Sequence, residues 1–164
     1  MHFPALLQLL RSWPPELATA LLAAVPFTEV RASIPLGLRF FHLSPWNALW
    51  SSFLGSLIPM PFVFWLFPPF LHWLERHMPP LHRFLDRYVR KLETHHRALY
   101  ERLGVIALFL IIAVPITGAG VWSASLLAVV FEIRRPLAAV TIIIGIFAAA
   151  LIMLGITLGF FHFF

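Results

Sequence analysis

The chain has 164 residues, of which 60% are hydrophobic and 12% charged, with a formal net charge of +5 and a mean hydropathy of +0.88. Soluble domains carry about 25% charged residues, so this composition excludes a soluble enzyme, a nucleic-acid-binding module and a disordered tail. The absence of cysteine excludes thiolate metal sites, disulfides and cysteine nucleophiles. The length fits a single small membrane domain over residues 1–164.

The first apolar stretch follows an N-terminal segment, residues 1–14, and is too short to cross a bilayer. Only 12 uncharged residues separate Glu16 from Glu29, enough for roughly 18 Å of helix against a hydrocarbon core of about 30 Å. We therefore expect residues 15–39 to form a re-entrant hairpin that enters the membrane, turns around 28–35 and leaves by the side it entered. Irregular backbone at membrane depth is tolerated only where protein or a water-filled cavity covers it, so this hairpin indicates a functional site.

The next apolar stretch is long enough to span the membrane. Residues 40–74 carry no formal charge over 35 positions, and we expect one long transmembrane helix over residues 44–75. It leads into a basic loop, residues 76–102, which holds seven of the twelve basic residues. The positive-inside rule makes this loop cytoplasmic. Both chain termini then lie outside if the short stretches are hairpins, and in the cytoplasm if they are full spans.

The basic loop itself has the pattern of an amphipathic surface helix over residues 79–102. Apolar residues recur at three-, four- and seven-residue spacing, and Asp86–Arg90 and Glu93–Arg97 are favourable i,i+4 pairs. A helix with a basic polar face is suited to lie at an anionic leaflet. Two interpretations stay open: the helix recruits anionic lipid headgroups, or it is a solvated face that sets the topology.

The third apolar stretch, residues 103–131, is interrupted near its middle. Pro115, Gly118 and Gly120 leave one run of 12 residues before them and one of 11 after them, and both residue types weaken a continuous helix. We therefore expect a second re-entrant hairpin over residues 103–131. The uncharged stretch that follows predicts a final transmembrane helix over residues 136–163.

Several landmarks recur at an offset of about 90 residues, which indicates two halves of similar design. The repeated landmarks are the pattern Ala-Val-Pro-x-Thr at 24–28 and 113–117, the prolines Pro45 and Pro136, and the glycines Gly55 and Gly145. One hairpin and one full span per half would invert the second half relative to the first, as in secondary transporters. The predicted fold is all-α and integral to the membrane: an inverted repeat of re-entrant helical hairpin plus transmembrane helix, with a cytoplasmic amphipathic helix between the halves.

Glu29 and Arg31 are the most expensive residues to place in a membrane. A charge near the bilayer centre costs about 2.5–3.5 kcal/mol on insertion scales, so such residues are functional candidates by default. In one hypothesis Arg31 binds an anionic group, because guanidinium donors match phosphate, while Glu29 takes up and releases a proton. In the other, the two residues form a structural pair that neutralises itself and pins the hairpin.

Other substrate-binding candidates lie at the second turn and at membrane boundaries. They are Thr117, Gly118, Gly120, Arg39, Arg134 and Arg135. The turn residues would offer backbone N–H groups and a hydroxyl at the start of a half-helix, where anions bind, although a tight bend that needs glycine explains them equally well. The three arginines are alternatively ordinary snorkelling anchors. No motif or histidine spacing predicts a metal, a cofactor or a catalytic residue, so we do not expect an enzyme.

Two short segments give the chain a resemblance to a known family. Residues 29–37 are Glu-Val-Arg-Ala-Ser-Ile-Pro-Leu-Gly, and residues 114–122 are Val-Pro-Ile-Thr-Gly-Ala-Gly-Val-Trp. They resemble the E-x-R-x-x-I-P-x-G and P-x-x-G-x-G-x-W segments of the small multi-drug export protein family, considered related to the DedA (VTT) superfamily. The resemblance implies a transporter-like protein of the prokaryotic plasma membrane with two re-entrant hairpins. In the DedA group the best-supported role is translocation of polyprenyl-phosphate carrier lipids or other phospholipids.

Three functions are compatible with these patterns. The first is a transporter or flippase for an anionic amphiphile such as a lipid phosphate, with Arg31 and residues 117–120 at the headgroup and Glu29 for proton coupling. The second is a proton-coupled exporter of cationic drugs through Glu29, which the nearby Arg31 disfavours. The third is a non-transporting membrane scaffold. We expect a homodimer or higher homo-oligomer, because re-entrant segments cannot face lipid, with membrane lipids and an anionic lipid substrate as partners and no nucleic acid.

Overall fold

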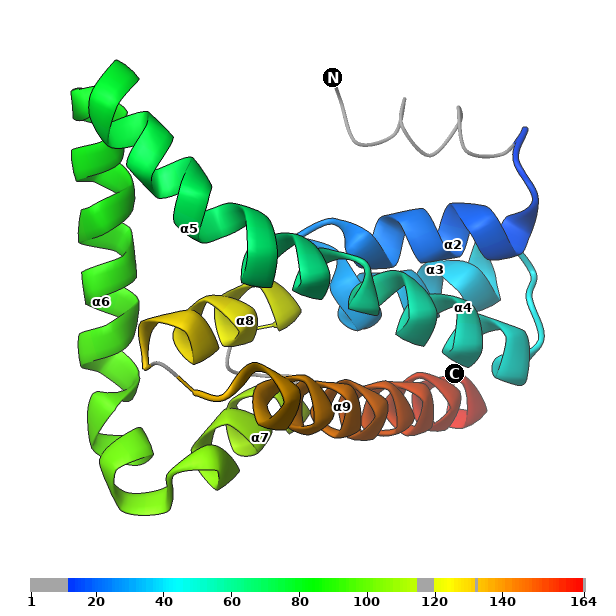
Figure 1. Ribbon diagram of the computed structural model, residues 1–164. Coiled ribbons are helices and arrows are strands. Elements are labelled where there is room, and N and C mark those ends of the chain that lie inside the picture. The colour runs from blue at the N-terminus through cyan, green and yellow to red at the C-terminus, as the bar shows by residue number, and fades with distance from the viewer. Residues whose placement is uncertain (1–11, 115–119, 132, 164) are drawn as a thin grey trace. The chain divides into compact units, whose positions relative to one another are not determined.

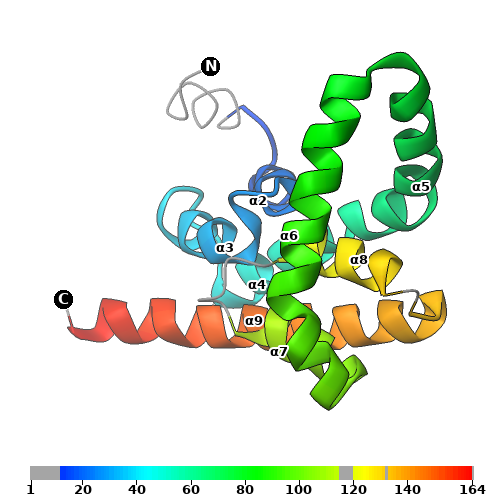
Figure 2. The same cartoon turned by 90° about the vertical axis from the view of Figure 1, so that its left-hand side faces the viewer.

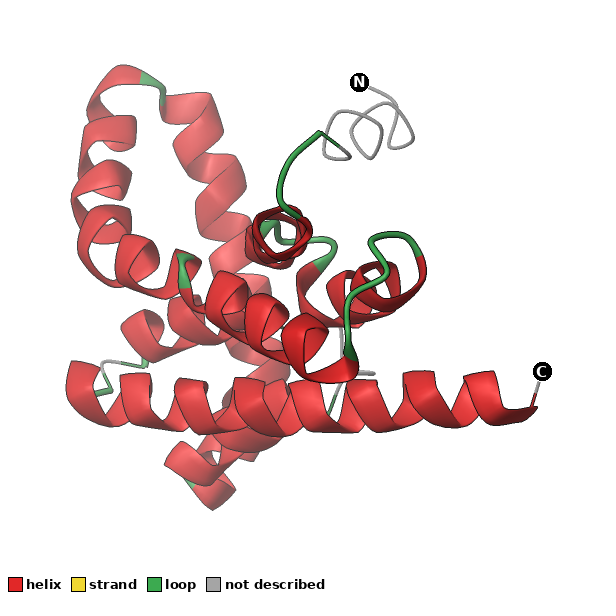
Figure 3. Cartoon of the chain, turned by 90° about the vertical axis from the view of Figure 1, so that its right-hand side faces the viewer, coloured by secondary structure: helices red, strands yellow, loops and turns green. Residues whose placement is uncertain are grey.

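The structure, a computed structural model, describes residues 12–114, 120–131 and 133–163, and every regular element in these ranges is a helix (Figure 1, Figure 3). The helices are α2 (Pro15–Ala24), α3 (Glu29–Arg39), α4 (Pro45–Leu57), α5 (Pro59–His77), α6 (Pro79–Leu103), α7 (Val105–Ala113), α8 (Val121–Val130) and α9 (Arg135–Phe163). The all-α prediction is therefore confirmed for the described residues. The expected single domain consists of two compact units, a first unit of Met1–Ile58 with Ile146–Phe164, and a second unit of Pro59–Gly145.

Two helical runs of the described chain are long and apolar enough to cross a membrane. One is Pro45–His77, with 33 residues and a mean hydropathy of 1.6, and the other is Arg135–Gly159, with 25 residues and a mean hydropathy of 2.8. They coincide with the two transmembrane segments that the sequence predicts. The apolar helices α2 and α8 have only 10 residues each, too few for a hydrocarbon core of about 30 Å.

The first of these two runs is not one continuous helix. It divides at Ile58 into α4 and α5, where the Ile58 N–H donates to the Gly55 carbonyl at 3.2 Å. Pro59 causes the division, because proline has no N–H to continue the i→i−4 ladder and its ring crowds the preceding turn. The expected helix over 44–75 is therefore two helices in sequence, and the two structural units meet along the chain at this division.

A helical pair, α2 and α3, begins the first unit, and its turn lies earlier than the sequence indicates. The structure places the turn at residues 25–28, and residues 29–39 form α3 with Pro35 in its interior. The predicted turn at 28–35 is therefore wrong. The Thr28 hydroxyl donates to the carbonyl oxygens of Leu22 and Val25, which ties the turn back to the end of α2.

Small residues hold α2, α3 and α4 of the first unit together. The Ser33 hydroxyl of α3 donates to the Ser52 hydroxyl of α4 at 2.8 Å, and the Ser56 hydroxyl donates to the Ala23 carbonyl of α2 at 3.3 Å. Gly55 lies directly against the backbone of α2 at Ala20. Close approach through small residues, with hydrogen bonds between helices, is typical of helix packing in membranes, where lipid removes the hydrophobic drive to associate.

The second unit contains α5, α6, α7, α8 and the first turns of α9. The stretch 103–131 forms two short helices, α7 and α8, on either side of the residues that include Pro115, in agreement with the break that proline and glycine predict. Figure 2 shows α6 as one long helix beside this short pair, and α6 contacts α5, α7 and α8. Its bounds match the expected amphipathic helix over 79–102 within one residue.

The glycines of the predicted repeat have similar surroundings in the two units. Gly55 of α4 packs on Ala20 of α2, and Gly145 of α9 packs on Ile112 of α7, where an added Cβ would lie 3.0 Å from the Ile112 Cβ. Each glycine therefore marks a close approach between the first helix of a pair and the helix that contains the glycine, which is α4 for Gly55 and α9 for Gly145. The inversion of one half relative to the other stays a prediction.

Candidate functional site

Glu29 is the first residue of α3, and its side chain is buried, with 7% of its surface exposed. Its φ angle of 38° lies in the left-handed region, which L-residues other than glycine rarely adopt because Cβ approaches the backbone carbonyl. A carboxylate at the first turn of a helix is favoured by the positive end of the helix dipole. The chain therefore holds an acidic side chain inside the first unit in a backbone conformation that glycine would adopt more easily.

Arg31 is half-buried on the same helix. Because the backbone of Glu29 is not helical, the spacing of residues along α3 does not fix the direction of its side chain relative to that of Arg31. Pro35 has no N–H, so the Arg31 carbonyl receives no helical hydrogen bond from it. Arg39 is the last residue of α3 and is exposed, in the position where a basic side chain complements the negative end of the dipole.

The second predicted turn is described only in part. Thr117 and Gly118 lie outside the described residues. Gly120 immediately precedes α8, is buried, and its carbonyl accepts the Ala124 N–H at 2.9 Å. It has the extended backbone of an N-cap residue, with φ −98° and ψ −156°, so Gly120 begins the helix as the sequence predicts.

Arg134 and Arg135 lie together in a pocket of the second unit. The pocket has a volume of about 300 Å³, and its lining residues are Phe64, Pro68, Ala128, Val129, Ile133, Arg134 and Arg135. The apolar wall comes from α5 and α8, while both charges come from the start of α9. Two guanidinium groups beside an apolar wall form a site for a ligand that carries negative charge and apolar surface together.

The start of α9 adds to the positive character of this pocket. The Ala138 N–H donates to the Arg134 carbonyl at 2.9 Å, so Arg134 caps the helix, and Pro136 occupies the first turn, where a missing N–H is tolerated. The first N–H groups of any helix have no intrahelical acceptor and carry the positive end of the dipole. These N–H groups and the two arginine side chains favour the same sign of ligand charge.

One buried polar group of α8 was not predicted from the sequence. Ser125 is fully buried, and its hydroxyl has no hydrogen-bond partner in the described chain. It stands three and four residues before Ala128 and Val129, so the three residues share the face of α8 that lines the pocket. A buried hydroxyl without a partner is uncommon in folded proteins. No local sequence signal distinguishes Ser125 from the structural serines of the first unit.

The predicted site residues therefore fall into two groups. Glu29, Arg31 and Arg39 lie on α3 in the first unit, and Gly120, Arg134 and Arg135 lie in the second unit. Within the described ranges, no three histidine, aspartate or glutamate side chains are grouped as metal ligands. The apolar wall of the pocket escaped the sequence analysis, because Phe64 and Pro68 are some 70 residues away from the arginines along the chain.

The helices and their composition define an all-helical membrane protein. A family model described as "Putative small multi-drug export protein" matches residues 29–152, and the chain belongs to this family. The match begins at Glu29 and includes both groups of predicted site residues. No curated protein and no solved structure matches the chain.

Proposed function

We propose that this protein carries an anionic amphiphile, such as a polyprenyl phosphate or another phospholipid, across the membrane without covalent chemistry. The pocket that contains Arg134 and Arg135 is the observation that carries this proposal. Arginine offers several coplanar donors and a charge that does not titrate, which suits a phosphate headgroup. The family description supports transport in general, and the charge of the pocket supports an anionic substrate.

The size of the pocket supports a headgroup site. A volume of about 300 Å³ is at the lower end of small-molecule pockets, so it can hold a phosphate with the first part of a chain and not a whole lipid. Acyl or isoprenoid tails need no protein cavity, because they can stay in the hydrocarbon while the headgroup crosses. The apolar wall of Phe64, Pro68 and Ile133 is suited to the first methylene groups of such a tail.

In this proposal α3 provides proton coupling. Glu29 is buried in the first unit and is the acidic group that would take up and release a proton, while Arg31 provides a second contact for an anionic headgroup. The alternative is the scaffold hypothesis, in which Glu29 and Arg31 neutralise each other and nothing is transported.

A second candidate function is the proton-coupled export of cationic drugs. The buried carboxylate of Glu29 and the family description favour it. Arg31, two residues from Glu29 along α3, disfavours it, because a cation bound near a guanidinium meets like-charge repulsion.

The direct test is a flipping assay in liposomes. Purified protein is reconstituted, a fluorescent polyprenyl phosphate is added, and an impermeant reductant then bleaches the label exposed outside. We expect the wild-type protein to make inner-leaflet label accessible, with no effect on a labelled cationic amphiphile. Movement of the cationic probe alone would favour the drug exporter, and movement of neither probe by folded protein would favour the scaffold.

We also propose a prokaryotic plasma-membrane location, with residues 76–102 in the cytoplasm by the positive-inside rule, and a homodimer or higher homo-oligomer. Phe27, at the tip of the α2–α3 pair, is 96% exposed, so its ring is available for the bilayer core or a second copy. Re-entrant helices need protein cover. Light scattering of the detergent-solubilised particle should give a mass of at least two chains, and a strict monomer would contradict the oligomer.

A further inference from the structure

The helix α6 carries two chemically different faces. At roughly 100° per residue, Leu81, Phe84 and Leu85 fall within one narrow arc, and Arg83, Arg87 and Arg90 fall on the opposite side of the helix. The sequence of α6 contains six basic and three acidic residues. A helix of this kind is hydrophobic along one side and positive along the other.

The apolar face of α6 is open over the first half of the helix. Phe84 is 61% exposed and Leu81 is 41% exposed. Monomeric soluble proteins rarely leave large aromatic and aliphatic side chains together on a helix face without an interaction partner. Although α6 contacts α5, α7 and α8, Leu81 and Phe84 stay exposed and can contact lipid or a partner protein.

The direction of α6 within the second unit indicates that its exposed apolar side chains contact the membrane. In Figures 1 and 2, α6 runs across the axis of the first turns of α9. Because α9 is long and apolar enough to cross the bilayer, a helix that runs across it lies parallel to the membrane plane, and the basic face of α6 favours the membrane surface. At the end of α5 that precedes α6, the rings of Trp73 and His77 stack 4.8 Å apart, and tryptophan is typical of the membrane–water interface.

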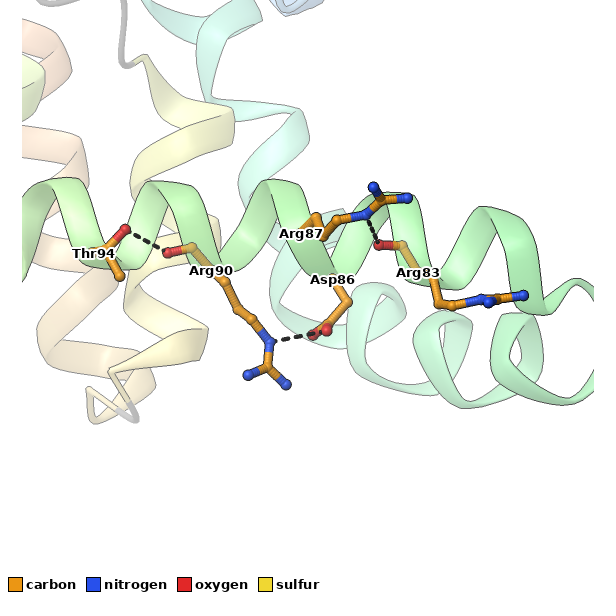
Figure 4. A network of polar contacts seen from close by, with 5 residues as sticks. All are labelled: Arg83, Asp86, Arg87, Arg90 and Thr94. Atoms are coloured by element: carbon orange, nitrogen blue, oxygen red, sulfur yellow. Dashed lines mark hydrogen bonds and ion pairs between the residues drawn. The ribbon is translucent and has the colours of Figure 1, made fainter.

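The side chains of the basic face are held along the helix. The Arg90 Nε donates to the Asp86 Oδ2 at 2.9 Å, and the Arg87 Nε donates to the Arg83 carbonyl at 3.1 Å (Figure 4). The Arg90–Asp86 pair is internally neutral, with the Arg90 side chain 74% exposed. No acidic side chain is shown bonded to Arg83 or Arg87 in the described chain, so their positive charge is available to an anionic surface.

We propose that α6 docks on an anionic bilayer surface, with Leu81 and Phe84 inserted between headgroups, while the long side chains of Arg83 and Arg87 reach back around the helix to lipid phosphates. Each basic residue near such a surface adds to the attraction, and the apolar side chains add area removed from water. The docking is independent of the transported substrate, because α6 lies outside the pocket of Arg134 and Arg135.

Site-directed spin labelling tests this proposal, because the chain has no cysteine. Leu81→Cys places a nitroxide on the apolar face, and Thr94→Cys places one about 140° away around the helix. Each labelled full-length protein is reconstituted in phosphatidylcholine vesicles, with or without about 30% phosphatidylglycerol to mimic an anionic leaflet. Collisions with oxygen, which dissolves in lipid, and with a water-soluble nickel chelate report where each label lies.

We expect the label at position 81 to collide mainly with oxygen in anionic vesicles, and the label at position 94 mainly with the chelate. Without phosphatidylglycerol the label at 81 should move toward water. Equal access of the chelate to both labels in anionic vesicles would overturn the proposal. Protection of position 81 from both reagents would also overturn it, because protein, such as α6 of a second copy, would then cover the face.

A charge variant and a matched control separate lipid docking from packing. Arg83→Gln with Arg87→Gln removes two positive charges. The ratio of docked to undocked α6, reported by the accessibility of the label at position 81, should fall roughly fivefold for each charge removed, equivalent to about 1 kcal/mol per residue. Asp86→Asn with Arg90→Gln changes two residues of the same helix without changing its net charge, and should leave the ratio unchanged. Equal effects of the two double variants would contradict the proposed role of charge.

Discussion

Gly55→Ala is expected to disrupt the first unit and give the largest loss of stability of any single methyl addition in the described helices. A Cβ at this position would overlap the carbonyl oxygen of Ala20 and would lie 2.6 Å from the Ala20 Cα. These are backbone atoms of α2, so no rotamer change can relieve the overlap and α2 must move away from α4. Overpacking usually costs about 1–3 kcal/mol, and we expect a loss of about 3 kcal/mol or more here.

Two other glycines of the chain provide a graded control. Gly155→Ala meets no atom within 4 Å and should be neutral or slightly stabilising, since alanine is the better helix former. Gly145→Ala meets the Ile112 side chain at 3.0 Å, which can adjust, so its effect should be intermediate. Heating each detergent-solubilised variant and measuring the folded fraction by size-exclusion chromatography gives the order. A Gly55→Ala protein as heat-stable as Gly155→Ala would show that α2 and α4 do not approach as the structure has them.

Arg134→Gln combined with Arg135→Gln is expected to abolish most of the lipid flipping while the protein stays folded. Both arginines are exposed, and exposed substitutions usually change stability by no more than about 0.5 kcal/mol. Hydrogen bonds to charged groups contribute about 1.5–3 kcal/mol each, so the loss of both arginines should lower flux roughly a hundredfold or more. The flipping assay with labelled polyprenyl phosphate measures this loss.

The controls distinguish the pocket from a general charge effect. Arg76→Gln with Lys91→Gln removes the same amount of charge from exposed positions outside the pocket and should keep nearly all of the flux. Arg134→Lys with Arg135→Lys keeps the two positive charges but lacks the planar guanidinium groups, so this variant should retain only part of the flux. Unchanged flux in the glutamine variant would remove the pocket from the transport path. Arg31→Gln adds a further distinction, because a transporter would stay abundant and lose flux, whereas a scaffold would lose abundance.

Much of the secondary structure follows from local features of the sequence. Pro45 opens α4, and α9 carries Pro136 in its first turn, because proline fits where a helix needs no N–H. The sequence predicts the break between α7 and α8 from Pro115, Gly118 and Gly120. The amphipathic pattern gives the bounds of α6 within one residue, since its polar and apolar positions follow the helical period.

The errors in the predicted elements arise where local signals compete. Pro35 marks a turn by itself, yet it lies inside α3, because membrane helices tolerate proline when neighbouring groups satisfy the backbone. The long apolar run around Pro59 predicts one helix, whereas the structure divides it at this proline into α4 and α5. Pro35 lies inside α3, and Pro68 and Pro69 lie inside α5, whereas Pro59 begins α5, so the presence of a proline does not by itself decide where a helix ends.

The sequence by itself determines the class of this protein, because a chain with so few charges cannot present most of its surface to water. It also determines which arginines and which carboxylate enter apolar surroundings, since each charge interrupts an otherwise uncharged run. Only the tertiary structure decides that the turn of the first pair lies at residues 25–28, that Gly55 touches α2, and that the apolar residues of α5 and α8 complete the pocket around Arg134 and Arg135. These features depend on contacts between segments tens of residues apart, whereas periodicity and composition report only on neighbours along the chain.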